Sequence, residues 1–299
     1  MGHNHGRVAQ VTEINIMKRL LVIFHIYYHE HIDYYIQKLK NINGVEWDMI
    51  VTYNEMKDET TAKIKDLKPD TVFFAVGNTG YDILPFIQAI KAHDIMKYDC
   101  IMKLHTKNID CRKKYKLNGI NLKNDRWRNI LVDSMLKTPE RFRRCMNILN
   151  DEKTGCLCSY ELYVKLTMKR KEDLSLLKNE AERIDIRTDS GKFCAGTMFI
   201  IRPECLRKIV EADIDLSRWQ NKGSHAKGTI AHVYERLLTL SVEDAGYNIS
   251  TLPTYCRNYP TVMVHNAVSP VIKWIFSLDR YGEDYRKCLT LFGKRIMLD

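Results

Sequence analysis

The chain has 299 residues, 45% of them hydrophobic, and a formal net charge of +10. This length suffices for one large or two modest domains with a buried core, and no apolar run approaches the roughly 20 residues that cross a bilayer. The nine cysteines are odd in number and form no CxxC pair, so neither a zinc ribbon nor a disulfide framework is indicated. We therefore expect reduced, mostly buried thiols in a cytoplasmic protein.

Residues 1–16 begin with the polar MGHNHG, and we interpret them as a tag or a disordered tail. The pattern then predicts strand 19–28, helix 31–42, strand 45–54, helix 60–68, strand 71–78, helix 80–93 and strand 100–107. It continues with two helices within 125–150, separated near Thr138-Pro139, strand 154–160, a charged helical and surface segment 160–190, strand 192–203, helix 204–212, helix 228–247, strand 248–253 and an amphipathic helix 271–296. Strands that alternate with helices predict an α/β fold with a mainly parallel central sheet flanked by helices.

The net positive charge favours an anionic partner such as nucleic acid, lipid headgroups or a phosphorylated substrate. The densest basic stretch, 111–128, includes Arg126 and Arg128, which either add charge to a binding pocket or belong to a solvated loop. No nucleic-acid-binding motif occurs and the basic residues form no helical stripe, so we do not expect nucleic acid as a partner.

The segment GNTGYD, residues 77–82, follows the strand at 71–78. Gly80 permits an unusual dihedral or a close backbone approach, while Asn78 and Asp82 can bond to a sugar or base, or cap the next helix. A plain strand–turn–helix junction is the alternative.

The next strand ends in His105-Thr106-Lys107. Lys103 and Lys107 share strand parity with His105, so the three side chains are expected on one side. Ligands of α/β proteins bind at such strand ends, and a histidine with lysines suits a diphosphate whose charge grows as a bond to it breaks. The alternative is a core histidine beside two surface lysines.

The first strand ends in His25, Tyr27 and Tyr28, with Thr52 expected nearby on the second strand. These side chains can stack on or bond to a nucleotide base, although aromatic residues here are as often core. His29 and His31 begin a helix in no known ligand spacing, so these histidines do not predict a metal site.

The second half of the chain offers a candidate base. AGTMFIIRP brings the small Gly196 and the neighbouring Thr197 to a strand end, where a substrate can lie against the backbone. In the helix at 228–247, Glu235 is suited to take a proton from a hydroxyl nucleophile. A structural or surface pair with Arg236 is the alternative.

These segments, in this order, resemble the rhamnan synthesis protein F family of bacterial polysaccharide glycosyltransferases. The resemblance is carried by Trp127 and by the segments FHIYYHE, IVTYNE, NTGYDILPF, YDCIMKLHTK, AGTMFIIRPE and GTIAHVYERL, which span about residues 19–250. It implies a GT-A-like domain at 17–255, with a donor half at about 17–110 and an acceptor half at about 111–255. A helical extension at 256–299 is expected to pack on this domain, and contact of its Lys273, Trp274 and Phe276 with a membrane surface is the alternative.

The family is similar to inverting GT-A enzymes, in which an Asp-x-Asp motif binds a metal–diphosphate. Here His105-Thr106-Lys107 stands at that position, which implies that fixed cations hold the diphosphate, or a metal bound partly through His105 and Asp82. Protonated lysine is a poor ligand for Mg²⁺ or Mn²⁺, so metal independence is favoured.

The motifs and the resemblance together assign roles. Glu235 is the expected catalytic base, with Glu243 and Asp244 as rivals late on the same helix. The expected donor-binding residues are His25, Tyr27, Thr52, Asn78, Gly80, Asp82, Lys103, His105 and Lys107. The expected acceptor-binding residues are Trp127, Gly196 and Thr197.

The resemblance implies inverting transfer of rhamnose, or another deoxy or furanose sugar, from a dTDP- or UDP-sugar. The implied acceptor is a glycan or a lipid-linked saccharide, reached in the cytoplasm or at the inner face of the membrane. Family members carry arginines around the Asn-Gly motif, whereas Thr79 and Tyr81 stand here, so the resemblance does not fix the donor. A catalytically inactive glycosyltransferase-like binding module is the alternative function.

Overall fold

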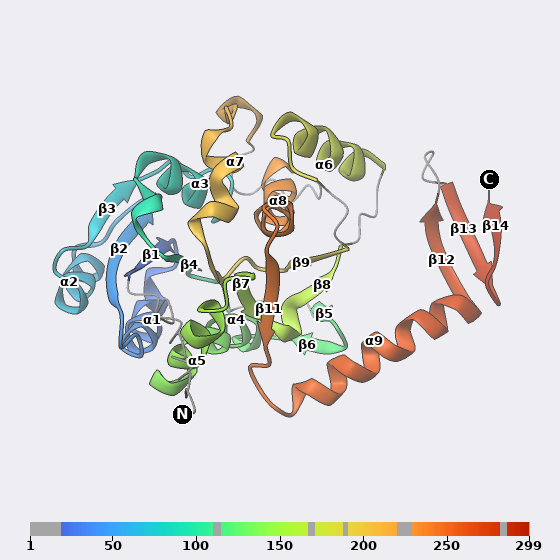
Figure 1. Cartoon of the computed structure of the whole chain (residues 1–299), viewed down its shortest axis with the longest axis horizontal. Helices are drawn as coiled ribbons and strands as arrows, with labels where there is room; N and C mark the ends of the chain where they lie inside the picture. The colour runs from blue at the N-terminus through green and yellow to red at the C-terminus, as the bar shows by residue number, and fades with distance from the viewer. Residues whose placement is uncertain are drawn as a thin grey trace, which may run out of the picture.

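A seven-stranded sheet forms the centre of the molecule, with strand order β11-β7-β10-β4-β1-β2-β3 (Figure 1). The computed structural model describes residues 19–109, 115–166, 171–187, 191–219, 229–281 and 286–298; the predicted tail at 1–16 lies outside them. In the sheet β10 is antiparallel to β4 and β7, and the other neighbouring strands are parallel. The predicted α/β fold with a mainly parallel sheet is confirmed.

Most elements lie where the sequence pattern places them. The strands of the main sheet are β1 Arg19–Ile26, β2 Glu46–Tyr53, β3 Val72–Ala75, β4 Cys100–His105, β7 Thr154–Ser159, β10 Phe199–Ile201 and β11 Asn248–Leu252. The helices around it are α1 Ile32–Leu39, α2 Asp58–Leu67, α3 Ile83–Ala92, α4 Arg126–Leu136, α5 Pro139–Leu149, α6 Lys171–Arg183, α7 Arg207–Glu211 and α8 Ile230–Asp244. The predicted break between α4 and α5 is a helix cap, since Oγ1 of Thr138 accepts a hydrogen bond from the backbone N–H of Arg141 and Pro139 begins α5.

Hydrophobic cores lie on both faces of the sheet. Along β1, Val22 and Phe24 pack into the core beneath α1, α2, α4 and α5, whereas Leu21 and Ile23 pack into the core beneath α3, α6, α7 and α8. These two groups of helices cover opposite faces (Figure 1). Because both faces of β1 are buried, its sequence is a continuous apolar run without alternation.

The predicted single strand at 192–203 is wrong. It is divided into β9 Lys192–Cys194, which pairs with β8 Tyr163–Lys165, and β10 in the main sheet. Gly196 and Thr197 separate them with φ of +89° and +44°, values that end extended structure. Since β10 pairs with β4, the predicted donor and acceptor halves share one continuous sheet.

The basic stretch contains a hairpin that the sequence analysis did not identify. β5 Tyr115–Leu117 and β6 Ile120–Leu122 are joined by Asn118 and Gly119, whose φ values are +46° and +79°. Asn-Gly is the preferred sequence for such a two-residue turn, so the signal was present.

The predicted helix at 271–296 requires a correction. Helix α9 Asn258–Ile275 ends near the start of that range, and the antiparallel strands β12 Phe276–Tyr281, β13 Arg286–Leu291 and β14 Lys294–Leu298 follow. Phe292 and Gly293 form the two-residue turn between β13 and β14, both with positive φ. The apolar residues of 271–296 also fit a helical period, which led to the wrong prediction. The positive φ values of Phe292 and Gly293 form a tight turn that lets β13 and β14 pair. The division of the chain at residues 255 and 256 stays a prediction.

A fully buried carboxylate anchors the start of α9. Glu161 accepts hydrogen bonds from the backbone N–H groups of Thr254 and Tyr255 and from the side-chain amide of Asn258, at 2.9–3.1 Å. The stacked rings of Tyr160 and Tyr259 add a contact beside it, with centroids 5.2 Å apart. Beyond these contacts at its N-terminal end, α9 extends away from the main sheet and carries β12, β13 and β14 at its far end (Figure 1).

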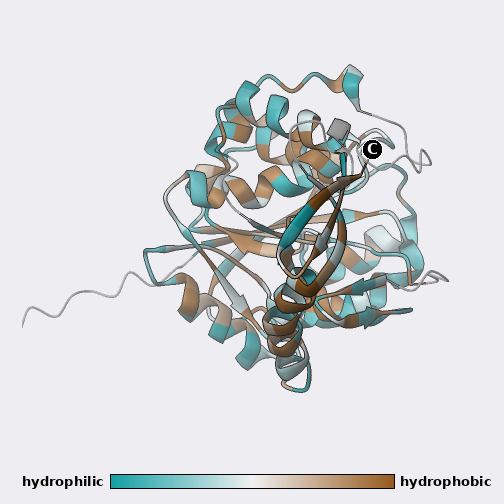
Figure 2. Ribbon diagram, turned by 90° about the vertical axis from the view of Figure 1, so that its right-hand side faces the viewer, coloured by the Kyte–Doolittle hydropathy of each residue, from teal (hydrophilic) through white to brown (hydrophobic). Residues whose placement is uncertain are grey.

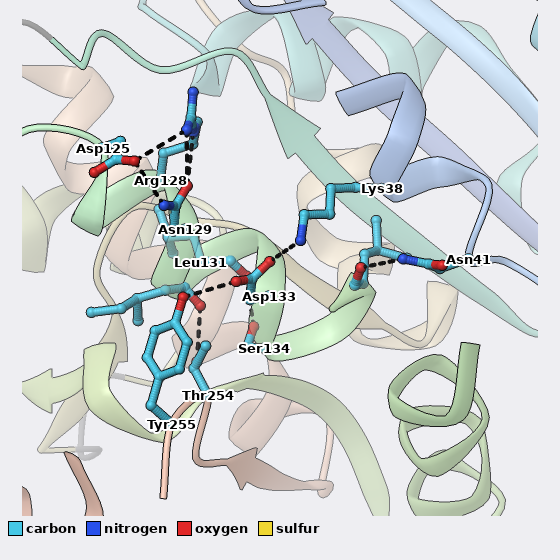
Figure 3. Close-up of polar contacts among 12 residues, drawn as sticks. Lys38, Asn41, Asp125, Arg128, Asn129, Leu131, Asp133, Ser134, Thr254 and Tyr255 are labelled. Carbon is cyan, nitrogen blue, oxygen red and sulfur yellow. Dashed lines mark hydrogen bonds and ion pairs between the residues drawn. The ribbon is translucent and has the colours of Figure 1, made fainter. Parts of the chain in front are cut away.

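Helix α4 connects the first helix to the segment that leads into α9. Asp133 of α4 forms an ion pair with Lys38 of α1 at 2.5 Å and accepts a hydrogen bond from the hydroxyl of Tyr255 at 2.8 Å (Figure 3). The side chain of Asn41 donates to the carbonyl of Leu136 at the end of α4, at 2.8 Å. These contacts fix α4 against the end of α1 and the segment before α9, and so help to position Trp127 at its start.

Helix length and hydropathy give no candidate membrane span anywhere in the described ranges. The eight described cysteines are all free thiols, and each except Cys256 is buried, as expected from their spacing; Cys111 lies outside these ranges.

We expect Glu161→Gln to lower the free energy of unfolding by about 1–3 kcal/mol, because one of the two acceptor oxygens is replaced by an NH2 group that faces buried donors. Urea unfolding of the variant and wild type measures this difference. Glu140→Gln, at an exposed carboxylate on α5, is the matched control and is expected to change stability little. Equal loss in both variants would contradict the anchoring role of Glu161.

Candidate functional site at the carboxyl end of the sheet

Asp82, Lys103 and Thr197 form a polar cluster where three segments meet. Nζ of Lys103 on β4 donates to Oδ2 of Asp82 at 2.5 Å and to Oγ1 of Thr197 at 3.0 Å. The hydroxyl of Thr197, in the turn before β10, donates to the same carboxylate oxygen at 2.9 Å. Burial raises the pKa of Asp82, but the charge of Lys103 and these hydrogen bonds outweigh it and hold that pKa well below its ordinary value. The cluster therefore contains an ionised carboxylate whose charge is balanced by Lys103.

His105 lies beside this cluster, with its Nδ1 3.4 Å from Oδ2 of Asp82. Its side chain is buried, and burial lowers the pKa of His105 well below its ordinary value in spite of the nearby carboxylate. The imidazole is consequently neutral at neutral pH. Its Nε2 is buried and has no hydrogen-bond partner within the described residues, so it can bond to a polar ligand.

The expectation that Lys103, His105 and Lys107 supply three fixed cations therefore needs correction. Lys103 is buried and already paired with Asp82, and His105 is neutral. Lys107 differs, because it is only partly buried and its Nζ lies 4.0 Å from the centre of the Trp127 ring. Lys107 is thus the member of the group whose charge is best placed for a ligand.

Thr106, to which the sequence analysis gave no role, joins the two strand ends. Its hydroxyl oxygen accepts hydrogen bonds from the backbone N–H groups of Tyr27 and Tyr28 at 2.8 and 2.9 Å. Its own N–H donates to the carbonyl of His25 at 2.9 Å. In the sequence, the available signal for this role was the short hydroxyl side chain of Thr106 between the longer polar side chains of His105 and Lys107.

The other predicted donor-binding residues lie at neighbouring strand ends but differ in access. Thr52 is fully buried and bonds to Nδ1 of His25 at 3.0 Å, so it can act on a ligand only through that histidine. Tyr27 is half-buried and its ring lies edge-on to that of Tyr28, whereas Asn78 is exposed. Their predicted contacts with a nucleotide stay predictions.

Gly80 adopts a φ of +69°, in agreement with the expected unusual dihedral. A Cβ atom here would lie 2.4 Å from Cβ of Leu84 and 2.6 Å from the ring of Trp219. The close approach at Gly80 is therefore to the protein's own core.

Glu235 and Gly196 meet on the other side of this site. The backbone N–H of Gly196 donates to Oε1 of Glu235 at 3.0 Å, and the side chain of Glu235 is 21% exposed. A Cβ atom at Gly196 would lie 2.9 Å from Leu131 and 3.1 Å from Nε1 of Trp127. That indole nitrogen is buried and has no partner within the described part of the chain. The carboxylate of Glu235, the backbone of Gly196 and the indole N–H of Trp127 thus lie close together. The side chain of Thr197 points instead into the Asp82 cluster.

The rival acidic residues on α8 make other contacts. Asp244 is 4% exposed and forms ion pairs with Arg187 at 3.2 Å and Lys208 at 2.9 Å. Glu243 accepts a hydrogen bond from the hydroxyl of Tyr163 at 3.5 Å. Asp244 thus has a structural role, which leaves Glu235 as the better candidate base.

Arg126 and Arg128, the arginines of the basic stretch that the structure describes, serve the fold. Arg128 is buried over the ring of Tyr34 at 3.8 Å and donates to the side chain of Asn129 (Figure 3). Arg126 donates to the side chain of Asn258 at 3.3 Å. Neither contact is with the Asp82 cluster, so the structure does not support their expected contribution to the donor pocket.

The residues at Asp82 and His105 do not fit a divalent metal. The ammonium group of Lys103 already contacts the carboxylate oxygen that a metal would use. Among the described residues no group of three or more His, Cys, Asp or Glu side chains is arranged to hold a metal ion.

The model of the rhamnan synthesis protein F family matches residues 4–247, so the chain belongs to this family. Two proteins named "Uncharacterized protein WxcX", from two strains of Xanthomonas campestris pv. campestris, are each 25% identical over 181 and 185 residues. Each match covers 58% of this chain, and the chain spans 24% of the length of these relatives.

Several solved structures share a general architecture with this chain. One is the mannosyltransferase PcManGT from Pyrobaculum calidifontis in complex with GDP-Man and Mn²⁺, with a TM-score of 0.41, 12% identity and coverage of 87% of this chain and 64% of that one. Another is glucosyl-3-phosphoglycerate synthase from Mycobacterium tuberculosis, with a TM-score of 0.40, 12% identity and coverage of 86% and 80%. Such low scores say nothing about the substrate of this chain.

The neutral state of His105 predicts a pH dependence of stability. Its pKa is lowered in the folded protein, so below the unfolded value of about 6.5 the unfolded chain binds a proton that the folded chain does not. This contribution is present above about pH 6.5 and is lost as the pH falls. Lowering the pH from about 7 to about 5 should reduce the free energy of unfolding of wild type by about 1–2 kcal/mol more than that of His105→Asn.

Urea unfolding at a series of pH values measures this effect. His93→Asn, which replaces a half-buried histidine at the end of α3, is the control and should retain the wild-type profile. Identical profiles for wild type and His105→Asn would contradict the neutral buried imidazole.

Proposed function

We propose that this chain is an inverting glycosyltransferase that moves a sugar from a nucleotide sugar to a saccharide acceptor during polysaccharide synthesis. The observation that carries the proposal is the carboxylate of Glu235, held by the N–H of Gly196 and partly open to solvent. It lies across from the strand end that bears His105 and Lys107, and membership of the family supports the same reaction class.

In the proposed reaction Glu235 takes the proton of an acceptor hydroxyl, whose oxygen attacks the anomeric carbon of the donor. The bond between that carbon and the diphosphate oxygen breaks as the new glycosidic bond forms, with inversion. The nucleoside diphosphate leaves with the electron pair of the broken bond. Lys107 lies at the strand end where this negative charge would develop, and Nε2 of His105, which has no hydrogen-bond partner among the described residues, would donate or accept a hydrogen bond there.

The proposed donor is a dTDP- or UDP-sugar, with rhamnose as the first sugar to test. Of the predicted contacts, the exposed Asn78 and the half-buried Tyr27 and Lys107 have side chains that can reach such a ligand. We also propose that the reaction requires no Mg²⁺ or Mn²⁺, because Lys103 neutralises Asp82.

A catalytically inactive binding module is the second candidate. The observation in its favour is that Asp82, Lys103 and Thr197 already satisfy one another, which leaves fewer charged groups for a diphosphate. Such a module would bind a nucleotide sugar without releasing nucleoside diphosphate.

We expect Glu235→Gln to lower the rate of transfer about 10²–10⁴-fold, because general base catalysis is lost. The assay measures release of nucleoside diphosphate from a panel of dTDP-, UDP- and GDP-sugars with saccharide acceptors, with and without EDTA. Glu243→Gln, on the same helix, is the matched control and should keep wild-type activity. Wild type that binds a donor in a thermal-shift assay but never releases nucleoside diphosphate would favour the inactive module.

We further propose that the protein acts in the cytoplasm and that its C-terminal extension contacts the inner face of the membrane. Several large apolar side chains of α9 and β12 are more than half exposed, namely Val264, Val271, Ile272, Trp274, Phe276 and Leu278. The apolar character of α9 and of the strands beyond it is visible in Figure 2. The same elements carry Lys273, Arg286, Lys287, Lys294 and Arg295, which suit an anionic lipid surface.

Val271→Ser combined with Ile272→Ser should weaken binding to vesicles containing an anionic phospholipid about tenfold or more, since two apolar side chains no longer enter the interface. Vesicle co-sedimentation measures this. Val72→Ser combined with Leu216→Ser, at exposed apolar positions elsewhere, is the matched control. Wild type that stays in the supernatant, or that self-associates through this surface instead, would contradict the membrane contact.

A further inference from the structure

A basic cavity of about 690 Å³ lies between α8, α9 and the short strands β5, β8 and β9. Its volume is within the range of pockets that hold small ligands. Five cationic side chains line it, against a single acidic residue, Asp173; the cations are Lys116, Lys165, Lys192, Arg236 and Lys273. His232 and His265 also line it.

One cation of this cavity has a counter-charge, because Nη1 of Arg236 lies 3.5 Å from Oε2 of Glu235. Within the described ranges no carboxylate forms an ion pair with Lys116, Lys165 or Lys273. Like charges around one concave surface raise its positive potential, which an anionic ligand would relieve. The lining thus points to an anion.

Arg236 provides a second observation. Its guanidinium lies 4.7 Å from the centre of the Phe193 ring, and its Nε is buried without a hydrogen-bond partner among the described residues. A buried donor of a charged group that is left without an acceptor is costly. An anionic oxygen that reached this donor would satisfy it, and arginine is a common partner of phosphate.

The cavity adjoins the candidate base through the chain itself. Ala195 and Arg236 line the cavity, and their immediate neighbours Gly196 and Glu235 form the hydrogen bond described above. A ligand group held in the cavity would therefore leave the adjoining part of the same ligand close to Glu235.

We propose that this cavity binds the phosphate of a phosphate-bearing saccharide acceptor and so orients its sugar hydroxyl toward Glu235. This inference rests on the proposed function and adds the chemical class of the acceptor. The phosphate belongs either to a soluble saccharide phosphate or to a saccharide joined by a diphosphate to a lipid. Apolar lining residues, among them Leu117, Val164 and Pro270, suit the sugar ring or the start of a lipid chain.

The first experiment measures binding of inorganic pyrophosphate by isothermal titration calorimetry, which needs no turnover. Lys116→Gln combined with Lys165→Gln should weaken binding at least about tenfold, or about 1.4 kcal/mol. Lys40→Gln combined with Lys57→Gln removes the same charge from exposed positions outside the cavity and should change binding less than about twofold. Pyrophosphate can also bind at the proposed donor site. Lys107→Gln tests this, because it should weaken binding at the donor site and leave binding in the cavity unchanged.

The second experiment separates the two sources of the phosphate. The same titration is repeated with glucose 1-phosphate and with an octyl-diphospho monosaccharide. Tighter binding of the octyl compound supports the lipid-linked source, and equal binding of the two supports the soluble source. Unchanged pyrophosphate binding in the Lys116/Lys165 variant, or equal weakening in the Lys40/Lys57 control, would overturn the proposal.

These outcomes are independent of the test of Glu235. Transfer activity together with unaffected anion binding in the cavity variant would reject the acceptor site and keep the transferase. Specific anion binding in a protein without transfer activity would reject the transferase and show a phosphate site that serves binding alone.

Discussion

The ion pair between Asp82 and Lys103 is the contact on which the candidate site depends. It links the segment after β3 to the centre of β4, and through Thr197 it also holds the turn between β9 and β10. A buried ion pair is weak evidence for stability, because desolvation offsets the attraction, but it specifies a single arrangement of its segments. Here it fixes the segments of Asp82, Lys103 and Thr197 relative to one another, beside a His105 imidazole that burial keeps neutral.

The charged groups around this site lie at different depths. Lys103 and Arg128 have charged groups with neighbours inside the protein, whereas Lys107 covers the face of Trp127 at the edge of the site. The basic cavity beneath α9 continues the positive surface on the acceptor side. Under the two proposals, the strand end with Lys107 binds the leaving diphosphate and the cavity binds the phosphate of the acceptor.

The position of α9 has consequences for both proposals. Glu161 fixes the beginning of this helix to the domain, and its middle supplies His265 to one wall of the cavity. Its later turns and β12 expose apolar side chains. A helix held firmly at one end and apolar at the other can bring a membrane-bound acceptor to the cavity, so the phosphate site and the membrane surface are consistent with one acceptor.

The sequence by itself determined the α/β class, most elements of the main sheet and the strand ends that meet, because buried parallel strands and amphipathic helices have local patterns. It also singled out His105 and Glu235 as residues of interest. Only the tertiary structure decided that Lys103 is neutralised by Asp82, that Asp244 is held by Lys208 and that β12, β13 and β14 stand where a helix was predicted. The physical reason is that pairing between charges, and between strands, depends on which distant segments meet, and hydrophobic periodicity does not encode that.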